Sequence, residues 1–172
     1  LETAAGVPQL QAVREAWLEG AEDVPIIADG GVKNDKDVFL ALVCGASTVM
    51  IGSALAGTEE SPGTVIEDPA SGQKLKIYRG MTSPQAVART HYAAEDENLE
   101  AALETPPEGQ EIQVPYKGSV VTILERMRGH LRSSVSYGGT GSLSELRELV
   151  LEHPDRYLVP LSDAAYRESY ER

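Results

Sequence analysis

Two short apolar runs, separated by one helix-like segment, most constrain what this chain can fold into. VPIIADGG occupies residues 24–31 and STVMIGS occupies residues 47–53. Both runs are rich in β-branched residues, which is typical of short strands buried on both faces. The intervening NDKDVFLALVCG has a helical pattern, with Asn34 or Asp35 as its cap and a glycine at its end. Strands that alternate with helices predict a parallel sheet in an α/β fold.

Periodicity and turn residues predict the elements around this core. Helices are expected at 8–19, at 119–132 and in SLSELRELVLE, where Ser142 and Glu145 suggest a capping box. TVIEDPASGQKLKIYRG predicts a hairpin that turns at DPASG, and QEIQVPYKG predicts a returning strand. A short helix is expected directly after STVMIGS. The acidic, weakly periodic residues 89–107 predict either a mobile flap or a solvated helix and loop.

Composition excludes several classes of function. The 172 residues fit one domain with its own core. A formal charge of −12 without a basic run argues against a nucleic-acid partner, because phosphate neutralisation needs clustered Lys and Arg. No apolar stretch approaches the roughly 18 residues of a membrane helix, and no signal-peptide pattern opens the chain. A single cysteine rules out an intramolecular disulfide, so we expect a cytoplasmic protein.

The polar residues and glycines at the two strand ends suggest a ligand site. In parallel α/β proteins, ligands gather at the carboxyl ends of strands. Asp29, Gly30 and Gly31 follow the first strand, and Gly52 and Ser53 follow the second. Glycine N–H groups and a serine hydroxyl suit a phosphate, and a carboxylate suits two ribose hydroxyls. The alternative is structural, because a DGG turn often serves only to allow positive φ.

Several motifs, in order and spacing, resemble the IMP dehydrogenase family and the related GMP reductases. They are VPIIADGGVKNDKDVFLALVCGASTVMIGSALAGTEESPG, then YRGMTS, then EGQEIQVPYKG. The resemblance runs from GVPQL at 6–10 to about LSELRE at 143–148 and touches the tail. It implies that residues 1–172 are the C-terminal part of a (β/α)₈ barrel, with VPIIADGG and STVMIGS as its seventh and eighth strands. The rest of the barrel is then expected upstream of Leu1, in a polypeptide that forms homotetramers.

The resemblance also implies roles for individual residues. Asp29 would hold the ribose hydroxyls, and YRGM, which contributes Tyr78, would help to bind the phosphate and the purine. A monovalent cation, potassium, would be bound by Glu168 and Ser169, although Tyr170 replaces the usual histidine. Thr82 likewise replaces the family's usual glycine. The implied substrate-binding residues are Asp29, Gly30, Gly31, Gly52, Ser53, Tyr78, Gly80, Met81, Thr82 and Glu108.

The implied reaction is the oxidation of IMP to XMP with NAD⁺. In the family, a cysteine attacks C2 of the purine, hydride leaves to the nicotinamide, and water hydrolyses the thioester-like intermediate. Cys44 is interpreted as a small buried hydrophobe, so the nucleophilic cysteine is expected upstream of Leu1, and the 172-residue chain alone is expected to be inactive. In residues 89–107, Arg89, His91 and Tyr92 are the candidates for activating water in the flap.

Two alternatives stay open at this stage. A GMP reductase would convert GMP to IMP with NADPH, and the reductases tend toward FYGM where this chain has YRGM. A non-catalytic nucleotide-binding homologue would keep the phosphate site but lack an upstream cysteine loop. The upstream coding region distinguishes these hypotheses.

Overall fold

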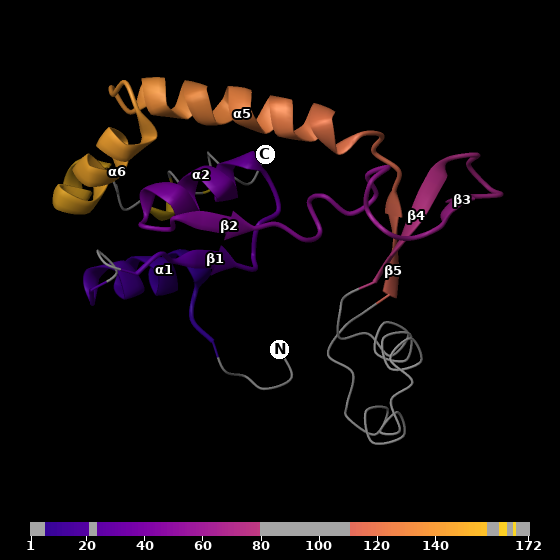
Figure 1. Cartoon of the computed structure of the whole chain (residues 1–172), viewed down its shortest axis with the longest axis horizontal. Helices are drawn as coiled ribbons and strands as arrows, with labels where there is room; N and C mark the ends of the chain where they lie inside the picture. Colours follow the sequence, from indigo (N-terminus) through magenta and orange to yellow (C-terminus); the bar gives the residue numbers. More distant parts are fainter. Residues whose placement is uncertain (1–5, 21–23, 80–110, 158–161, 165–166, 168–172) are drawn as a thin grey trace, which may run out of the picture. The chain divides into compact units, whose positions relative to one another are not determined.

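The computed structural model describes residues 6–20, 24–79, 111–157, 162–164 and 167 (Figure 1). The chain divides into two compact units. One, here called the α/β unit, spans 7–51 and 127–172, and the other, here called the hairpin unit, spans 1–6 and 52–126. A parallel pair of strands lies in the α/β unit, and an antiparallel three-stranded sheet lies in the hairpin unit.

The α/β unit confirms the predicted alternation of helices and strands. Its first elements are α1 (Gln9–Leu18), β1 (Ile27–Asp29), α2 (Asp35–Val43) and β2 (Thr48–Met50). β1 and β2 pair in parallel, with Ala28 opposite Val49 and Asp29 opposite Met50. The predicted parallel sheet is therefore present, with the carboxyl ends of both strands at one edge.

Helix α2 begins with a complete capping box. The side chain of Asn34 accepts a hydrogen bond from the Asp37 N–H at 3.2 Å, and the Asp37 carboxylate accepts from the Asn34 N–H at 3.1 Å. The Lys33 N–H also donates to Asp37, at 2.9 Å. Of the two predicted caps, the structure selects Asn34, because its extended backbone lets the side chain reach the first turn.

The strands are shorter than predicted, and the described residues cover only one face of them. Ala28 is fully buried, whereas Ile27 and Met50 are 59% and 53% exposed. The run that starts at Val24 becomes a strand only at Ile27. Pro25 contributes to this delay, since proline has no N–H to donate to a neighbouring strand. The prediction of strands buried on both faces is therefore wrong for the described chain.

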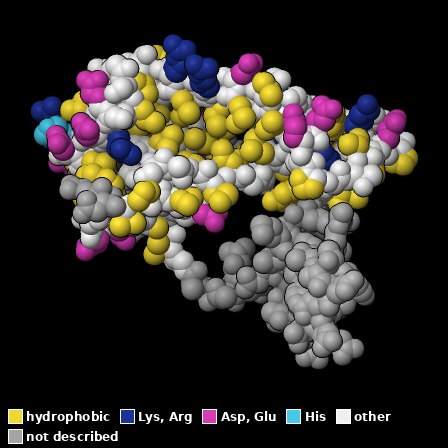
Figure 2. Space-filling model, in the orientation of Figure 1, with side chains coloured by type: hydrophobic (Ala, Val, Ile, Leu, Met, Phe, Trp, Pro, Cys, Tyr) yellow, Lys and Arg dark blue, Asp and Glu magenta, His cyan; other side chains and the backbone are white. Residues whose placement is uncertain are grey.

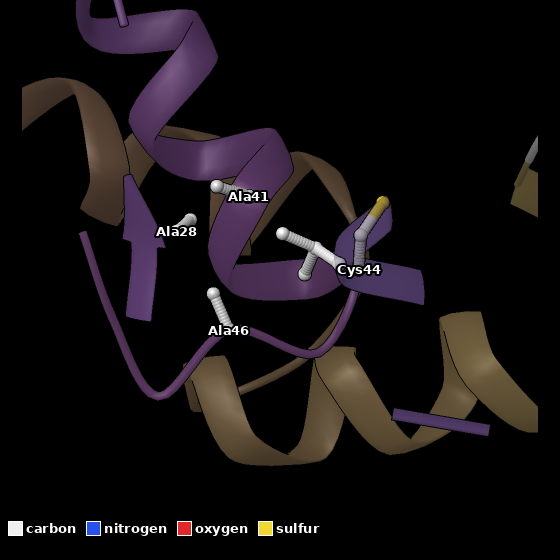
Figure 3. Close-up of a cluster of buried hydrophobic side chains, with 5 residues drawn as sticks. Ala28, Ala41, Cys44 and Ala46 are labelled. Carbon is white, nitrogen blue, oxygen red and sulfur yellow. The ribbon is translucent and has the colours of Figure 1, made fainter. Parts of the chain in front are cut away.

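Three clusters of buried side chains pack the α/β unit. The cluster in Figure 3 joins α1, β1 and α2 and includes Ala28, Ala41, Cys44 and Ala46. A second cluster places Met127 of α5 against Val32 and Val38, and a third packs α2 against α6. Hydrophobic side chains also gather on the surface around α2, β2 and α5 (Figure 2).

The hairpin unit confirms the predicted hairpin and the returning strand. β3 (Val65–Glu67), β4 (Lys74–Arg79) and β5 (Glu111–Pro115) form an antiparallel sheet with β4 in the centre. Arg79 pairs with Glu111, so the residues on either side of 80–110 are neighbours in the sheet. The hairpin turns at the predicted DPASG, where the Asp68 carboxylate accepts from Ala70 N–H and Ser71 Oγ.

A turn replaces the short helix that was expected after β2. Residues 53–57 form hydrogen-bonded turns, and Gly57 has a φ of +85°. A Cβ on Gly57 would lie 2.3 Å from the Pro115 carbonyl oxygen, so only glycine fits between this turn and β5. The close approach and the left-handed backbone end any helix at this point.

The C-terminal helices complete the described chain. They are α5 (Val120–Tyr137), α6 (Leu143–Glu152) and α7 (Pro154–Tyr157). α5 runs five residues beyond the predicted end at 132, and α7 was not predicted. Ser142 caps α6 as expected, but Glu145 accepts from the Gly141 N–H rather than from its predicted capping-box partner. No helix among the described residues has the length and apolar character needed to cross a membrane.

Candidate functional site

The edge where β1 ends carries an available carboxylate followed by two glycines. Asp29 is the last residue of β1 and is exposed. Among the described residues its carboxylate has no hydrogen-bond partner. Gly30 and Gly31 have φ angles of +95° and +75°, which residues other than glycine rarely adopt. The DGG turn thus meets a backbone requirement and also leaves the Asp29 carboxylate free to bind a ligand.

The turn after β2 carries the second group of predicted site residues and belongs to the hairpin unit. The Gly52 carbonyl accepts from the N–H groups of Leu55 at 3.0 Å and Ala56 at 3.2 Å. Within the described chain, the N–H groups of Gly52, Ser53 and Ala54 donate to no other residue. Gly52 and Ser53 are both exposed. Three available N–H groups and a serine hydroxyl make this turn, here called the Gly52 turn, suitable for an anion.

Tyr78 brings a further donor to the Gly52 turn. It lies on β4, opposite Ile112 of β5. Its hydroxyl oxygen is 3.4 Å from the position that a Cβ on Gly52 would occupy. The structure therefore brings together Gly52 and Tyr78, which are 26 positions apart in the sequence (78 − 52). The phenol can donate a hydrogen bond beside the turn.

The other predicted site residues are placed as follows. Asp29, Gly30 and Gly31 lie in the α/β unit, and Gly52, Ser53 and Tyr78 lie in the hairpin unit. The flap 89–107 and the remaining candidates lie outside the described residues, namely Gly80, Met81, Thr82, Arg89, His91, Tyr92, Glu108, Glu168 and Ser169. The described part of the chain contains no group of His, Cys, Asp or Glu side chains that would hold a metal ion.

Cys44 has the structural role predicted for it. It caps the C-terminus of α2, is 6% exposed and packs beside Ala28, Ala41 and Ala46 (Figure 3). Burial raises the pKa of its thiol, and the charge of Arg14 opposes this only in part. A buried thiol with a raised pKa forms little thiolate, which is the nucleophilic form.

A buried ammonium group that belongs to no predicted site stabilises the loop that follows the Gly52 turn. Lys76 is 3% exposed, and its Nζ donates to the carbonyl oxygens of Thr58 at 2.6 Å, Glu59 at 3.0 Å and Ser61. Strand alternation places Lys76 on the same face of β4 as Tyr78. That alternation was the one signal in the sequence that would have associated Lys76 with the site.

Glu60 connects this loop to the start of α5. Its carboxylate accepts from Ser119 Oγ and from the Val120 N–H, each at 2.7 Å. These hydrogen bonds, first from Ser119 and then from Val120, lower the pKa of Glu60. A carboxylate at the N-terminus of a helix satisfies an unpaired N–H and interacts favourably with the helix dipole.

Lys117 also contacts the Gly52 turn and was given no role from sequence. Its Nζ donates to the Ala54 carbonyl oxygen at 2.9 Å and lies 3.5 Å from the Ser53 carbonyl oxygen. The residue belongs to the YKG of the third motif, but its acceptors are more than 60 positions away. No local pattern predicts such a contact.

Comparisons with known proteins agree with the motifs. The model of the IMP dehydrogenase / GMP reductase domain matches residues 1–171. The inosine-5′-monophosphate dehydrogenase of Aquifex aeolicus is 41% identical over 166 residues, which cover 96% of this chain and 32% of that protein. The GMP reductase of Leishmania donovani is 40% identical over 172 residues, which cover 98% of this chain and 33% of that protein.

A solved structure extends the agreement to the fold. A cysteine-to-alanine variant of GMP reductase from Trypanosoma brucei, in complex with guanosine 5′-monophosphate, superposes with a TM-score of 0.76 at 39% identity. The match covers 97% of this chain and 32% of that one, so the chain spans about a third of the length of these relatives. With a family model matched over residues 1–171 and relatives about 40% identical along nearly all of its length, the chain belongs to the IMP dehydrogenase/GMP reductase family.

Proposed function

We propose that this chain is the nucleotide-binding part of a purine nucleotide oxidoreductase and that the Gly52 turn binds the 5′-phosphate of the substrate. The observation that carries the proposal is the Tyr78 hydroxyl beside Gly52, next to N–H groups with no partner in the described chain. Phosphate oxygens accept several hydrogen bonds at once, and this turn offers donors of three kinds. Family membership supports a nucleotide as the source of that phosphate.

The remaining contacts to the nucleotide follow the family pattern. We assign the ribose hydroxyls to Asp29, whose carboxylate is exposed at the end of β1. Gly30 and Gly31 form the turn that follows it. The purine is assigned to Gly80, Met81, Thr82 and Glu108 on the basis of the motifs YRGMTS and EGQ.

We further propose that β1 and β2 are the seventh and eighth strands of a (β/α)₈ barrel. The exposed face of this strand pair carries Ile27, Thr48, Asp29 and Met50, and it faces away from the buried Ala28. A partly apolar face with a carboxylate at the carboxyl end of a strand fits the interior of an incomplete barrel. Residues 1–172 would form the C-terminal part of that domain, in a homotetrameric, cytoplasmic protein.

The reaction that we favour is the oxidation of IMP to XMP, with NAD⁺ as the hydride acceptor. YRGM supports this direction over GMP reduction with NADPH, the second candidate, which is supported by the reductase relative at 40% identity. Since Cys44 is buried with a raised pKa, we assign the attack on C2 to a cysteine outside residues 1–172. This chain then binds and orients the nucleotide for that attack.

Two further parts of the proposal concern residues outside the described chain. The flap 89–107 would exclude or activate water during hydrolysis of the intermediate, with Arg89, His91 and Tyr92 as candidates. Glu168 and Ser169 are the proposed potassium ligands, because hard oxygen ligands suit a monovalent cation. No catalytic step is assigned to that ion.

Steady-state kinetics of the intact protein tests the proposed function. NADH formation from IMP and NAD⁺ is expected, without NADPH oxidation in the presence of GMP. Ser53→Ala is expected to raise the KM for IMP by about tenfold or more, since a hydrogen bond to a charged group contributes roughly 1.5–3 kcal/mol.

Ser133→Ala is the matched control, because Ser133 is an exposed serine whose hydroxyl donates only to the Gly129 carbonyl within α5. Its KM should equal that of the parent. An unchanged KM in Ser53→Ala would contradict the phosphate site, and turnover of GMP with NADPH alone would favour the reductase.

A further inference from the structure

The side chain of Lys117 forms hydrogen bonds to backbone carbonyl oxygens of the Gly52 turn. Its ammonium donates to the Ala54 carbonyl oxygen at 2.9 Å and lies 3.5 Å from that of Ser53. Its own backbone is fixed to the far end of the same turn, because the Lys117 N–H donates to the Gly57 carbonyl oxygen at 2.9 Å. The neighbouring Gly118 forms a β-bridge with Thr58. The side chain therefore extends from an anchored backbone to two carbonyls.

The contact with Ser53 helps to fix the orientation of the Ala54 N–H, which has no acceptor among the described residues, together with the Ala56 N–H, which donates to the same Ser53 oxygen at 3.2 Å. A trans peptide is planar, and its C=O and N–H point in opposite directions. The Ser53 carbonyl belongs to the same peptide plane as the Ala54 N–H. A cation that attracts the Ser53 oxygen therefore turns the Ala54 N–H away from Lys117.

The second contact has a similar consequence further along the turn. The Ala54 carbonyl shares a peptide plane with the Leu55 N–H, which donates to the Gly52 carbonyl at 3.0 Å. Lys117 thus stabilises the peptide that closes the turn as well as the one that presents the N–H of Ala54. Pre-orienting donors toward an anion avoids the cost of reorganising them when the anion binds.

We propose that Lys117 is a positioning residue for the 5′-phosphate site, acting through the backbone of the Gly52 turn and not by touching the phosphate. This inference rests on the proposed function, since it assigns the turn to a nucleotide phosphate. It adds a residue that the substrate-binding assignment above does not contain. Its bonds to carbonyl oxygens distinguish Lys117 from the donors assigned to the anion.

The test compares Lys117→Met in the intact protein with Lys74→Met, an exposed lysine on β4. Calorimetry measures the affinity of each variant for IMP and for inosine, which lacks the phosphate. Lys117→Met should weaken IMP binding by about tenfold, the equivalent of one lost hydrogen bond to a charged group. Inosine binding should stay unchanged in both variants, and Lys74→Met should bind IMP like the parent.

The salt dependence of IMP affinity distinguishes a positioning role of Lys117 from a direct attraction between Lys117 and the phosphate. Between exposed charges the Debye length falls from about 10 Å at 0.1 M salt to about 3 Å at 1 M. A backbone effect should persist, so the tenfold loss is expected at about 0.1 M and at about 1 M KCl alike. A loss that disappears at high salt would mean that Lys117 attracts the phosphate directly, which would overturn the proposal.

Two further variants complete the test. Lys117→Arg keeps a long cationic donor and should recover most of the affinity for IMP. Three results would each overturn the positioning role. One is that Lys117→Met binds IMP as tightly as Lys74→Met does. The others are an equal loss of affinity for inosine in Lys117→Met and a Lys117→Arg variant that recovers no affinity for IMP. If Ser53→Ala also binds IMP like the parent, the phosphate site itself fails, and both proposals fall together. If Ser53→Ala weakens IMP binding and Lys117→Met does not, only the positioning role fails.

Discussion

Lys76→Met is expected to lower the free energy of unfolding by about 1–3 kcal/mol, the cost of leaving a buried hydrogen-bond acceptor without its donor. Methionine fills a similar volume but donates no hydrogen bond. The carbonyl oxygens of Thr58, Glu59 and Ser61 would all lose the Lys76 ammonium. Thr58 is only 1% exposed, so water cannot readily replace the lost donor at that position.

Chemical unfolding of the intact protein, combined with hydrogen exchange, measures this effect. Lys74→Met on the same strand is the control, because Lys74 is exposed, and its change should stay within about 0.5 kcal/mol. Amides of residues 57–61 should exchange faster in Lys76→Met and normally in Lys74→Met. Equal unfolding curves for the two variants would show that the three contacts of Lys76 contribute nothing to stability.

Asp29→Ala is expected to lower the affinity for IMP by about 10- to 150-fold. The range corresponds to roughly 1.5–3 kcal/mol, the contribution of a hydrogen bond to a charged group. Asp29 is exposed and has no partner among the described residues, so its substitution should leave stability nearly unchanged. Loss of affinity without loss of stability is the signature of a ligand-binding carboxylate.

A thermodynamic cycle that combines Asp29→Ala with an altered ligand makes the test specific for the ribose contact. The 2′,3′-dideoxy analogue of IMP lacks both ribose hydroxyls, so the parent and Asp29→Ala should bind it with equal affinity. Asp155→Ala, at an exposed position in α7, should bind IMP like the parent. If Asp29→Ala lowers the affinity for the analogue as much as the affinity for IMP, the carboxylate does not contact the ribose hydroxyls.

Local sequence patterns predicted the elements whose causes are local. Asn34 caps α2 and Ser142 caps α6 because a cap depends on residues three positions apart. The end of α5 was placed too early, at residue 132, although the helix continues to Tyr137. In the structure, Ser133 and Ser136 donate to carbonyls four residues earlier and remain helical.

Contacts between distant segments were beyond local reasoning. Lys76 and Lys117 reach carbonyl acceptors 15–18 and 63–64 positions away, and a backbone carbonyl has no signature in the sequence. Burial of the strands failed as a prediction for a related reason. Ile27 and Met50 are apolar, but none of the described residues covers them.

A crystal structure of the intact protein with IMP tests the central claim most directly. We expect the 5′-phosphate oxygens to lie within hydrogen-bond distance, about 2.7–3.2 Å, of the backbone N–H groups of the Gly52 turn and of the hydroxyls of Ser53 and Tyr78. We also expect both ribose hydroxyls to lie at the Asp29 carboxylate. A phosphate bound elsewhere, with the Gly52 turn facing only water, would contradict the claim.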